Sequence, residues 1–143
     1  MTAYLVDTNL PSELTKPTPH PDVADFLVRA GRKHVYASVV TIGEICKGIA
    51  GLPESRRRSE LRNWLDEVMR PWFEGRILPV TEGVAERWGT LTAEQRLRGR
   101  QITMADGLIA ATALEHGLTL VTRNVKDFEG LDVALINPWD EAS

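Results

Sequence analysis

The stretch Tyr-Leu-Val-Asp-Thr-Asn at residues 4–9 starts as an apolar strand and then changes to three polar side chains. Three consecutive apolar residues are typical of a short buried strand. The run stops at Asp7, where such a strand would ordinarily continue apolar, and an unpaired buried carboxylate is costly. No lysine or arginine lies nearby in the sequence, so a divalent cation shared with other acids is the simplest partner for Asp7.

Short apolar runs alternate with longer helical patterns along the rest of the chain, which is typical of βαβ units and a mostly parallel sheet. Further strands are expected at 34–38, 76–80, 118–121 and 134–136, with a short helical turn at 124–128. Helices are expected at 21–30, 41–49, 54–73, 82–98 and 103–116, the last closed by Gly117. We therefore predict a three-layer α/β/α sandwich around a short, mostly parallel sheet of four or five strands.

The composition fits one ordinary folded domain covering residues 1–143. The hydrophobic fraction is 43% and the charged fraction 26%, and this length is a common size for a single core. The sole cysteine, Cys46, cannot form an internal disulfide, and one cysteine with three histidines offers no zinc site. Neither a signal peptide nor a membrane-length apolar run is evident, so we expect a cytoplasmic protein without membrane association.

Four carboxylates are distinguished by their positions. Asp7 ends the first strand, Glu44 opens the helix after the second, Asp106 opens the most apolar helix and Asp127 follows the fourth strand. In open α/β sheets, ligands bind outside the carboxyl ends of the strands, so Asp7, Glu44 and Asp127 are expected there. Asp106 reaches the same edge if its helix packs on the sheet there. The net charge of −3 does not argue against an anionic ligand, because a divalent cation would offset clustered carboxylates.

Helix capping is the competing explanation for three of these acids. Glu44, Asp106 and Asp127 each follow a capping residue by three positions, as in a capping box, and each would also gain from the helix dipole. The expected capping residues are Thr41, Thr103 and Asn124. Capping and metal binding are compatible, and Asp7 has no such alternative.

The donor types at these positions indicate a hard cation. Carboxylates with neighbouring hydroxyl and amide oxygens suit Mg²⁺ or Mn²⁺ rather than zinc or copper. The residues alone therefore predict a metal site built from Asp7, Glu44, Asp106 and Asp127. The neighbouring hydroxyl and amide side chains, in supporting roles, are Thr8, Asn9, Ser38, Thr122 and Asn124. Such a site can activate a metal-bound water for hydrolysis of a phosphodiester.

Several segments, in the same order along the chain, resemble the PIN-domain ribonucleases and, within them, the VapC-like toxins of bacterial toxin–antitoxin pairs. The matching segments are Leu-Val-Asp-Thr-Asn at 5–9 with Ser-Glu at 12–13, residues 38–45, residues 106–113, Leu-Val-Thr-Arg-Asn at 120–124 with Asp-Phe at 127–128, and Ile-Asn-Pro-Trp at 136–139. Each segment alone is a weak signal, whereas the ordered set is specific.

The resemblance implies a PIN-like α/β/α fold and Mg²⁺- or Mn²⁺-dependent cleavage of single-stranded RNA. It matches Asp7, Asp106 and Glu44 to the acids of the family's metal site. The fourth acid varies in the family, so both Asp127 and Asn124 remain candidates for that position. The resemblance further implies a homodimer that a cognate antitoxin silences, with the amphipathic stretches 21–30 and 54–73 as candidate antitoxin surfaces.

Other readings of the sequence remain open. A catalytically silent PIN-like module that binds RNA or a partner is the alternative, although the intact acids argue against it. An aspartate-nucleophile phosphatase would need an acid where Asn9 stands. Glu13 is expected to be a solvated helix residue that could reach the edge of the site.

Two sets of side chains outside the acids have both a structural and a functional interpretation. The run at 56–58 is three arginines, which form either a solvated face or a contact with the RNA backbone. Three tryptophans lie at core-facing helical spacing and are predicted to pack rather than to stack on bases, namely Trp64, Trp72 and Trp88.

Overall fold

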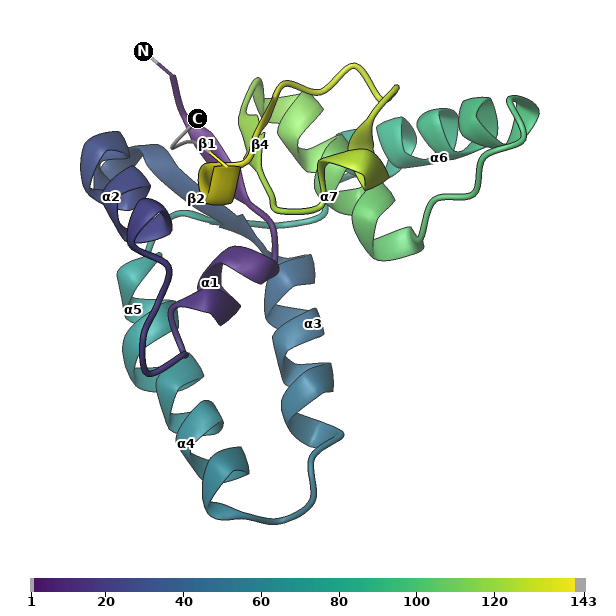
Figure 1. The fold of residues 1–143 in the computed structure, drawn as a ribbon. Coiled ribbons are helices and arrows are strands. Elements are labelled where there is room, and N and C mark those ends of the chain that lie inside the picture. Colours follow the sequence, from purple (N-terminus) through teal and green to yellow (C-terminus); the bar gives the residue numbers. More distant parts are fainter. Residues whose placement is uncertain (1, 141–143) are drawn as a thin grey trace.

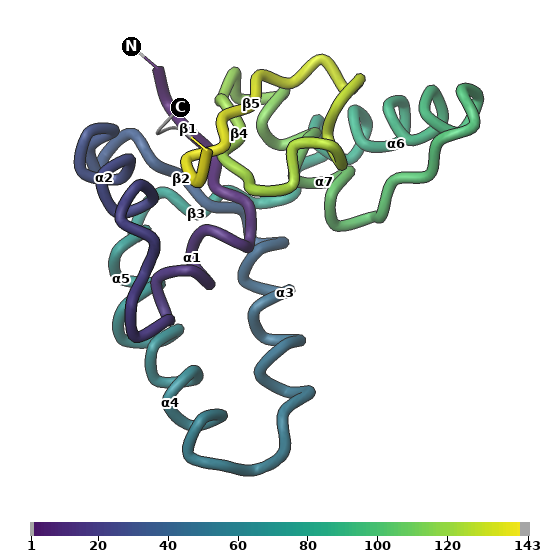
Figure 2. The backbone as a smooth tube through the Cα atoms, in the orientation of Figure 1, coloured from purple at the N-terminus to yellow at the C-terminus, as the bar shows by residue number. Residues whose placement is uncertain are grey.

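The computed structural model describes residues 2–140, and its centre is a five-stranded parallel sheet. The strands are β1 (Tyr4–Val6), β2 (Val35–Ser38), β3 (Ile77–Leu78), β4 (Thr119–Val121) and β5 (Leu135–Ile136), in the order β3-β2-β1-β4-β5 (Figure 2). Leu5 lies opposite Tyr36 on β2 and Leu120 on β4. Because all pairs are parallel, the carboxyl ends of the strands meet at one edge of the sheet.

Helices cover both faces of this sheet. The main helices are α1 (Asn9–Glu13), α2 (Pro21–Ala30), α3 (Val39–Ala50), α4 (Arg56–Trp64), α5 (Arg70–Trp72), α6 (Glu82–Leu97) and α7 (Met104–His116). Shorter turns are η1 (Arg32–His34), η3 (Val125–Phe128) and η4 (Pro138–Asp140), and η2 (Leu65–Met69) is a π-helical turn. Within residues 2–140, no helix is long and apolar enough to cross a membrane.

The two faces of the sheet bury alternate residues of the same strands. Val6 and Val121 pack with α2, α3 and the α4–α5 segment, whereas Leu5 and Leu120 pack with α6 and α7 (Figure 1). All four side chains are fully buried, as expected for a parallel sheet that is covered on both faces. The predicted three-layer α/β/α sandwich is therefore confirmed.

Several predicted boundaries are wrong by a few residues. The second strand begins at Val35, because His34 belongs to the turn η1. The helix expected at 41–49 begins at Val39, with Ser38 as its N-cap. The helix expected at 54–73 is instead α4, η2 and α5 in succession, and Val68 in its middle is exposed.

Two predictions about local packing are confirmed. Gly117 adopts the left-handed conformation at the end of α7, with φ 64°, which favours glycine. The three helix tryptophans are half-buried and pack against the cores: Trp64, Trp72 and Trp88.

Candidate active site

Asp7 lies directly after β1 and its carboxylate is held by two donors. Thr122 Oγ1 donates to Oδ2 at 2.8 Å, and the backbone N–H of Thr8 donates to Oδ1 at 2.8 Å. The side chain is buried, at 6% exposure, and Thr122 is fully buried. The backbone N–H of Asp7 continues the sheet by donating to the carbonyl of Val121 at 2.8 Å. The carboxylate is therefore fixed in orientation at the carboxyl edge of the sheet.

Glu44 reaches the same region from the second turn of α3. Its Oε1 accepts a 2.7 Å hydrogen bond from Thr8 Oγ1. Thr8 therefore donates to both acids, through its backbone N–H to Asp7 and through its hydroxyl to Glu44. The predicted capping box at Thr41 and Glu44 is wrong. The N-cap is Ser38, whose hydroxyl accepts from the N–H of Val40 at 3.0 Å, and the first turn of α3 contains no acid. Glu44 therefore has no capping role.

Asp106 and Asp127 differ in how they are held. Thr103 caps α7 by accepting from the backbone N–H of Asp106 at 3.1 Å, which confirms the predicted cap. Asp127 lies on η3 and is exposed. The capping box expected there is wrong, because the Asn124 side chain makes no capping bond. The backbone N–H of Asn124 donates instead to Thr122 Oγ1, at 3.0 Å.

The carboxylates lie near enough to one another for their charges to raise the pKa values of Asp7 and Asp106. Burial raises the pKa of Asp7 above its ordinary value, against the hydrogen bonds from Thr122 and Thr8, and the charges of Glu44 and Asp127 raise it further. Burial raises the pKa of Asp106 to about 6, and the charge of Asp7 is the next largest cause, followed by smaller effects of Asp127 and Glu44. Like charges at one site disfavour ionisation in this way.

The donor set fits a hard divalent cation. Within residues 2–140, no lysine, arginine or histidine forms an ion pair with any of the four acids. Four carboxylates without a cationic partner suit Mg²⁺ or Mn²⁺ by charge and by ligand type. In the same part of the chain no three His, Cys, Asp or Glu side chains already stand close enough to hold an ion, so a bound ion would draw these carboxylates inward.

The predicted supporting residues separate into two groups. Thr8 and Thr122 contact the acids directly, and Asn9 donates to Thr122 Oγ1 at 3.4 Å. Ser38 acts on the backbone, since its hydroxyl begins the helix that carries Glu44. The side chain of Asn124 is exposed beside η3.

Glu13 is the main residue whose environment differs from expectation. It was predicted to be solvated but is buried, at 5% exposure, and accepts from Trp139 Nε1 at 2.9 Å. Lys16 Nζ and the backbone N–H of His20 also donate to it, at 3.0 and 3.2 Å. Trp139 carries Arg123 on its ring face, at 5.6 Å from guanidinium carbon to ring centroid. No pattern in the sequence around Glu13 predicts its contact with Trp139, because the two residues are 126 positions apart in the chain.

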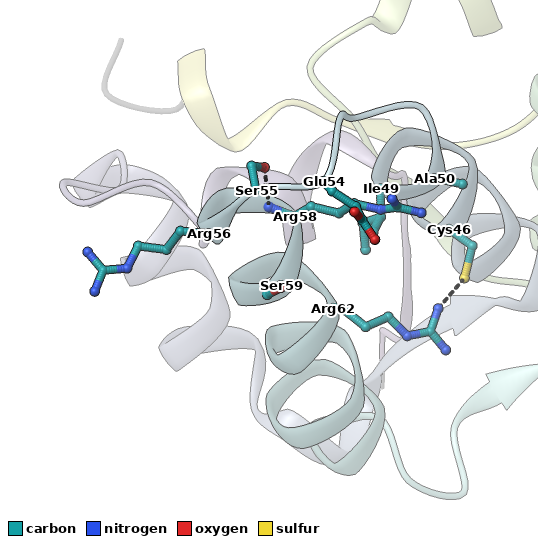
Figure 3. A pocket seen from close by; sticks show the side chains of 9 residues that line it. All are labelled: Cys46, Ile49, Ala50, Glu54, Ser55, Arg56, Arg58, Ser59 and Arg62. Atoms are coloured by element: carbon teal, nitrogen blue, oxygen red, sulfur yellow. Dashed lines mark hydrogen bonds between the residues drawn. The ribbon is translucent and has the colours of Figure 1, made fainter.

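The arginine run predicted as either a solvated face or an RNA contact borders a separate cleft. Figure 3 shows Arg58 and Arg62 directed toward the end of α3, where Arg62 donates to Cys46 Sγ at 3.9 Å, while Arg56 points away. The cleft measures about 610 Å³ and lies between the last turn of α3 and the first turns of α4. Contact of the run at 56–58 with RNA stays a prediction.

Comparison with known proteins identifies relatives along nearly the whole chain. The model of the PIN domain family matches residues 4–133. The toxin FitB of Neisseria gonorrhoeae is 38% identical over 137 residues, covering 96% of this chain and 99% of FitB. The VapC ribonuclease Y4jK of Sinorhizobium fredii is 35% identical over 138 residues, covering 96% and 99% of the two chains.

A solved structure has the same fold as this chain. The crystal structure of FitAcB from Neisseria gonorrhoeae superimposes with a TM-score of 0.88 at 38% identity, covering 96% of this chain and 99% of the matched chain.

Proposed function

The chain belongs to the PIN-domain family, and from this premise we propose that it is a divalent-metal-dependent endoribonuclease that acts as the toxin of a toxin–antitoxin pair. Among its relatives, FitB is named a toxin and Y4jK a ribonuclease. The observation that carries the proposal is Asp7, a buried carboxylate with three further acids around it and no basic partner among residues 2–140.

The proposed ligands of the metal are Asp7, Glu44 and Asp106, with Mg²⁺ as the physiological ion and Mn²⁺ as its substitute. A bound divalent ion would supply Lewis-acid activation of a water and neutralise charge on the phosphate. Thr122 and Thr8 fix the two oxygens of Asp7, and Thr8 also orients Glu44.

The fourth position of the site has two candidates on one short turn. Asp127 supports that role by its charge, which acts on both Asp7 and Asp106. Asn124 could orient a water or a phosphate without adding charge. We propose that Asp127 is the fourth acid of the site, at its exposed side.

The proposed partners are a cognate antitoxin, single-stranded RNA and a second copy of the chain. Expression of the protein alone should arrest bacterial growth, and co-expression of the small neighbouring open reading frame should relieve the arrest. Unaffected growth at high levels of active protein would contradict the toxin role while leaving the nuclease intact.

The nuclease is tested with purified protein and a labelled single-stranded RNA. Cleavage should require Mg²⁺ or Mn²⁺, stop in excess EDTA and disappear in Asp7→Asn. Asp25→Asn, the same chemical change on the exposed part of α2, serves as the matched control and should cleave normally. Cleavage that continues in EDTA would refute the metal-dependent mechanism. RNA binding without cleavage by the metal-loaded protein would favour the catalytically silent module.

A further inference from the structure

The buried carboxylate of Glu13 joins three segments that are distant in the sequence. It lies at the end of α1 and accepts hydrogen bonds from Lys16, from the backbone before α2 and from Trp139 on η4. These bonds, that of Trp139 foremost, lower its pKa to about 2, so Glu13 is ionised at every pH at which the protein would work. A charged, fully bonded group of this kind fixes the position of whatever it holds.

The group that Glu13 holds is the indole of Trp139, and the indole in turn supports Arg123. The indole N–H points to the Glu13 carboxylate, while the ring face lies under the Arg123 guanidinium at 5.6 Å. We call this arrangement of Glu13, Trp139 and Arg123 the stacked arginine. Cation–π stacking restrains the guanidinium plane and leaves its N–H edge free for other acceptors.

The backbone of Arg123 is tied to the candidate active site. Its N–H donates to Asn9 Oδ1 at 3.4 Å, and the preceding residue, Thr122, donates its hydroxyl to Asp7 at 2.8 Å. The stacked arginine therefore lies at the same edge of the sheet as the four acids. The Arg123 side chain is exposed, and among residues 2–140 no carboxylate forms an ion pair with it.

An acidic site that acts on RNA needs a cation beside it. Four ionised carboxylates carry a charge of −4, and one divalent ion leaves −2, which repels an anionic strand. Guanidinium groups bind phosphate oxygens through paired N–H donors and hold their charge at all relevant pH values. An arginine that is held at the rim of the site and has no carboxylate partner among residues 2–140 meets this need with little ordering of its side chain on binding.

We propose that Arg123 binds a phosphate of the single-stranded RNA next to the bond that is cut, and that Glu13 and Trp139 are positioning residues that hold it there. This inference rests on the proposed function, because it assigns a contact for the same substrate. RNA is favoured over an acidic peptide because the contact lies beside a site suited to phosphodiester chemistry.

The test measures both cleavage kinetics and binding of a fluorescent single-stranded RNA at several salt concentrations. Arg123→Ala should raise KM and Kd about tenfold, as expected for a lost charge-assisted hydrogen bond, and leave kcat within about threefold. The logarithm of the association constant decreases with the logarithm of the salt concentration, and this slope should become less negative by about 0.7, the value for one phosphate contact in single strands. Lys33→Ala, which removes one exposed positive charge in η1 at the opposite edge of the sheet, should change none of these.

Trp139→Phe separates positioning from structure. It keeps a ring under Arg123 but removes the N–H that donates to Glu13, so KM should rise in the wild-type background and not rise further in Arg123→Ala. Equal effects of Trp139→Phe in both backgrounds would refute the positioning role. If Trp139→Phe does not fold, Arg123→Ala still decides the central point.

The outcomes distinguish this inference from the proposed function. Wild-type cleavage with unchanged KM and salt slope in Arg123→Ala would overturn the role of Arg123 and leave the nuclease intact. Arg123-dependent RNA binding by a wild-type protein that does not cleave would overturn the nuclease and support Arg123. A wild-type protein that neither binds nor cleaves RNA would overturn both.

Discussion

Replacing Asp106 with asparagine is expected to stabilise the metal-free protein at neutral pH. The pKa of Asp106 is raised from 3.8 to about 6 by burial and by three neighbouring acids. Each pKa unit corresponds to about 1.36 kcal/mol, so the ionised side chain costs at most about 3 kcal/mol. Solvent screening at this half-buried position reduces the expected gain to roughly 1–2 kcal/mol, which is about 3–8 °C in Tm for a domain of this size.

The pH dependence of this gain follows from the direction of the shift. Because the pKa is higher in the folded protein than in the unfolded chain, the folded state binds the proton more tightly. The cost is absent below about pH 4, grows as the pH rises toward 6 and is complete above it. The Asp106→Asn protein should therefore match the wild type in stability near pH 4 and exceed it at pH 7.5.

Thermal unfolding in EDTA at these two pH values provides the measurement, followed by titration with Mn²⁺. The wild type should gain about 2.7 kcal/mol when Mn²⁺ is present at a hundred times its Kd, and Asp106→Asn should gain much less. Asp25→Asn on the exposed part of α2 is the matched control and should behave as the wild type in both solutions. An Asp106→Asn protein that is no more stable than the wild type in EDTA at pH 7.5 would refute the claim that burial and the neighbouring acids make the charge of Asp106 unfavourable in the folded protein.

Two further substitutions test how the site is held. Thr8→Val removes the 2.7 Å hydrogen bond to Glu44 and should lower kcat about tenfold. Thr8→Ser keeps the hydroxyl and should cleave RNA nearly as fast as the wild type. Equal cleavage rates for the two variants would contradict the role of the hydroxyl. Gly107→Ala would place a Cβ 2.8 Å from the Trp88 ring and should destabilise the protein by about 1–3 kcal/mol in denaturant unfolding. Gly89→Ala is the control: a Cβ there would have no atom within 4 Å, so the protein should be unchanged or stabilised by up to about 1 kcal/mol. Similar losses of stability in both variants would show that the close approach at Gly107 is unimportant.

The fold could be predicted because its signals are local. Leu5 and Val6 are adjacent in sequence yet bury into opposite layers, and such fully apolar runs are typical of a sheet covered on both faces. Parallel strands then bring their carboxyl ends together, which is why Asp7, Glu44 and Asp127 could be expected at one edge.

Helix starts were harder to predict where two capping residues compete. Ser38 and Thr41 are both good N-caps, and the glutamate three residues after Thr41 favoured the later start. The structure resolves the competition through burial, because Thr41 is fully buried in the interior of α3 while Ser38 lies at the end of β2. That burial depends on tertiary packing, which the local pattern does not contain.

Glu13 could not be interpreted from its neighbours at all. An acid that is followed by a lysine three residues later is typical of an ion pair on the solvated face of a helix. Its strongest partner, Trp139, is supplied by the other end of the chain. Contacts between such distant segments can be seen only in the folded structure. The position of Arg123, which depends on the contact between Glu13 and Trp139, could therefore not be predicted from the sequence either.

The central claim is that Asp7, Glu44 and Asp106 hold the ion that the nuclease uses, and anomalous diffraction from crystals soaked in Mn²⁺ tests it most directly. We predict a peak whose ion lies about 2.0–2.2 Å from carboxylate oxygens of Asp7 and Asp106, with Glu44 coordinating directly or through a water. The same soak of Asp7→Asn crystals should show no peak. An ion bound elsewhere, or an unchanged peak in the Asp7→Asn crystals, would contradict the assignment.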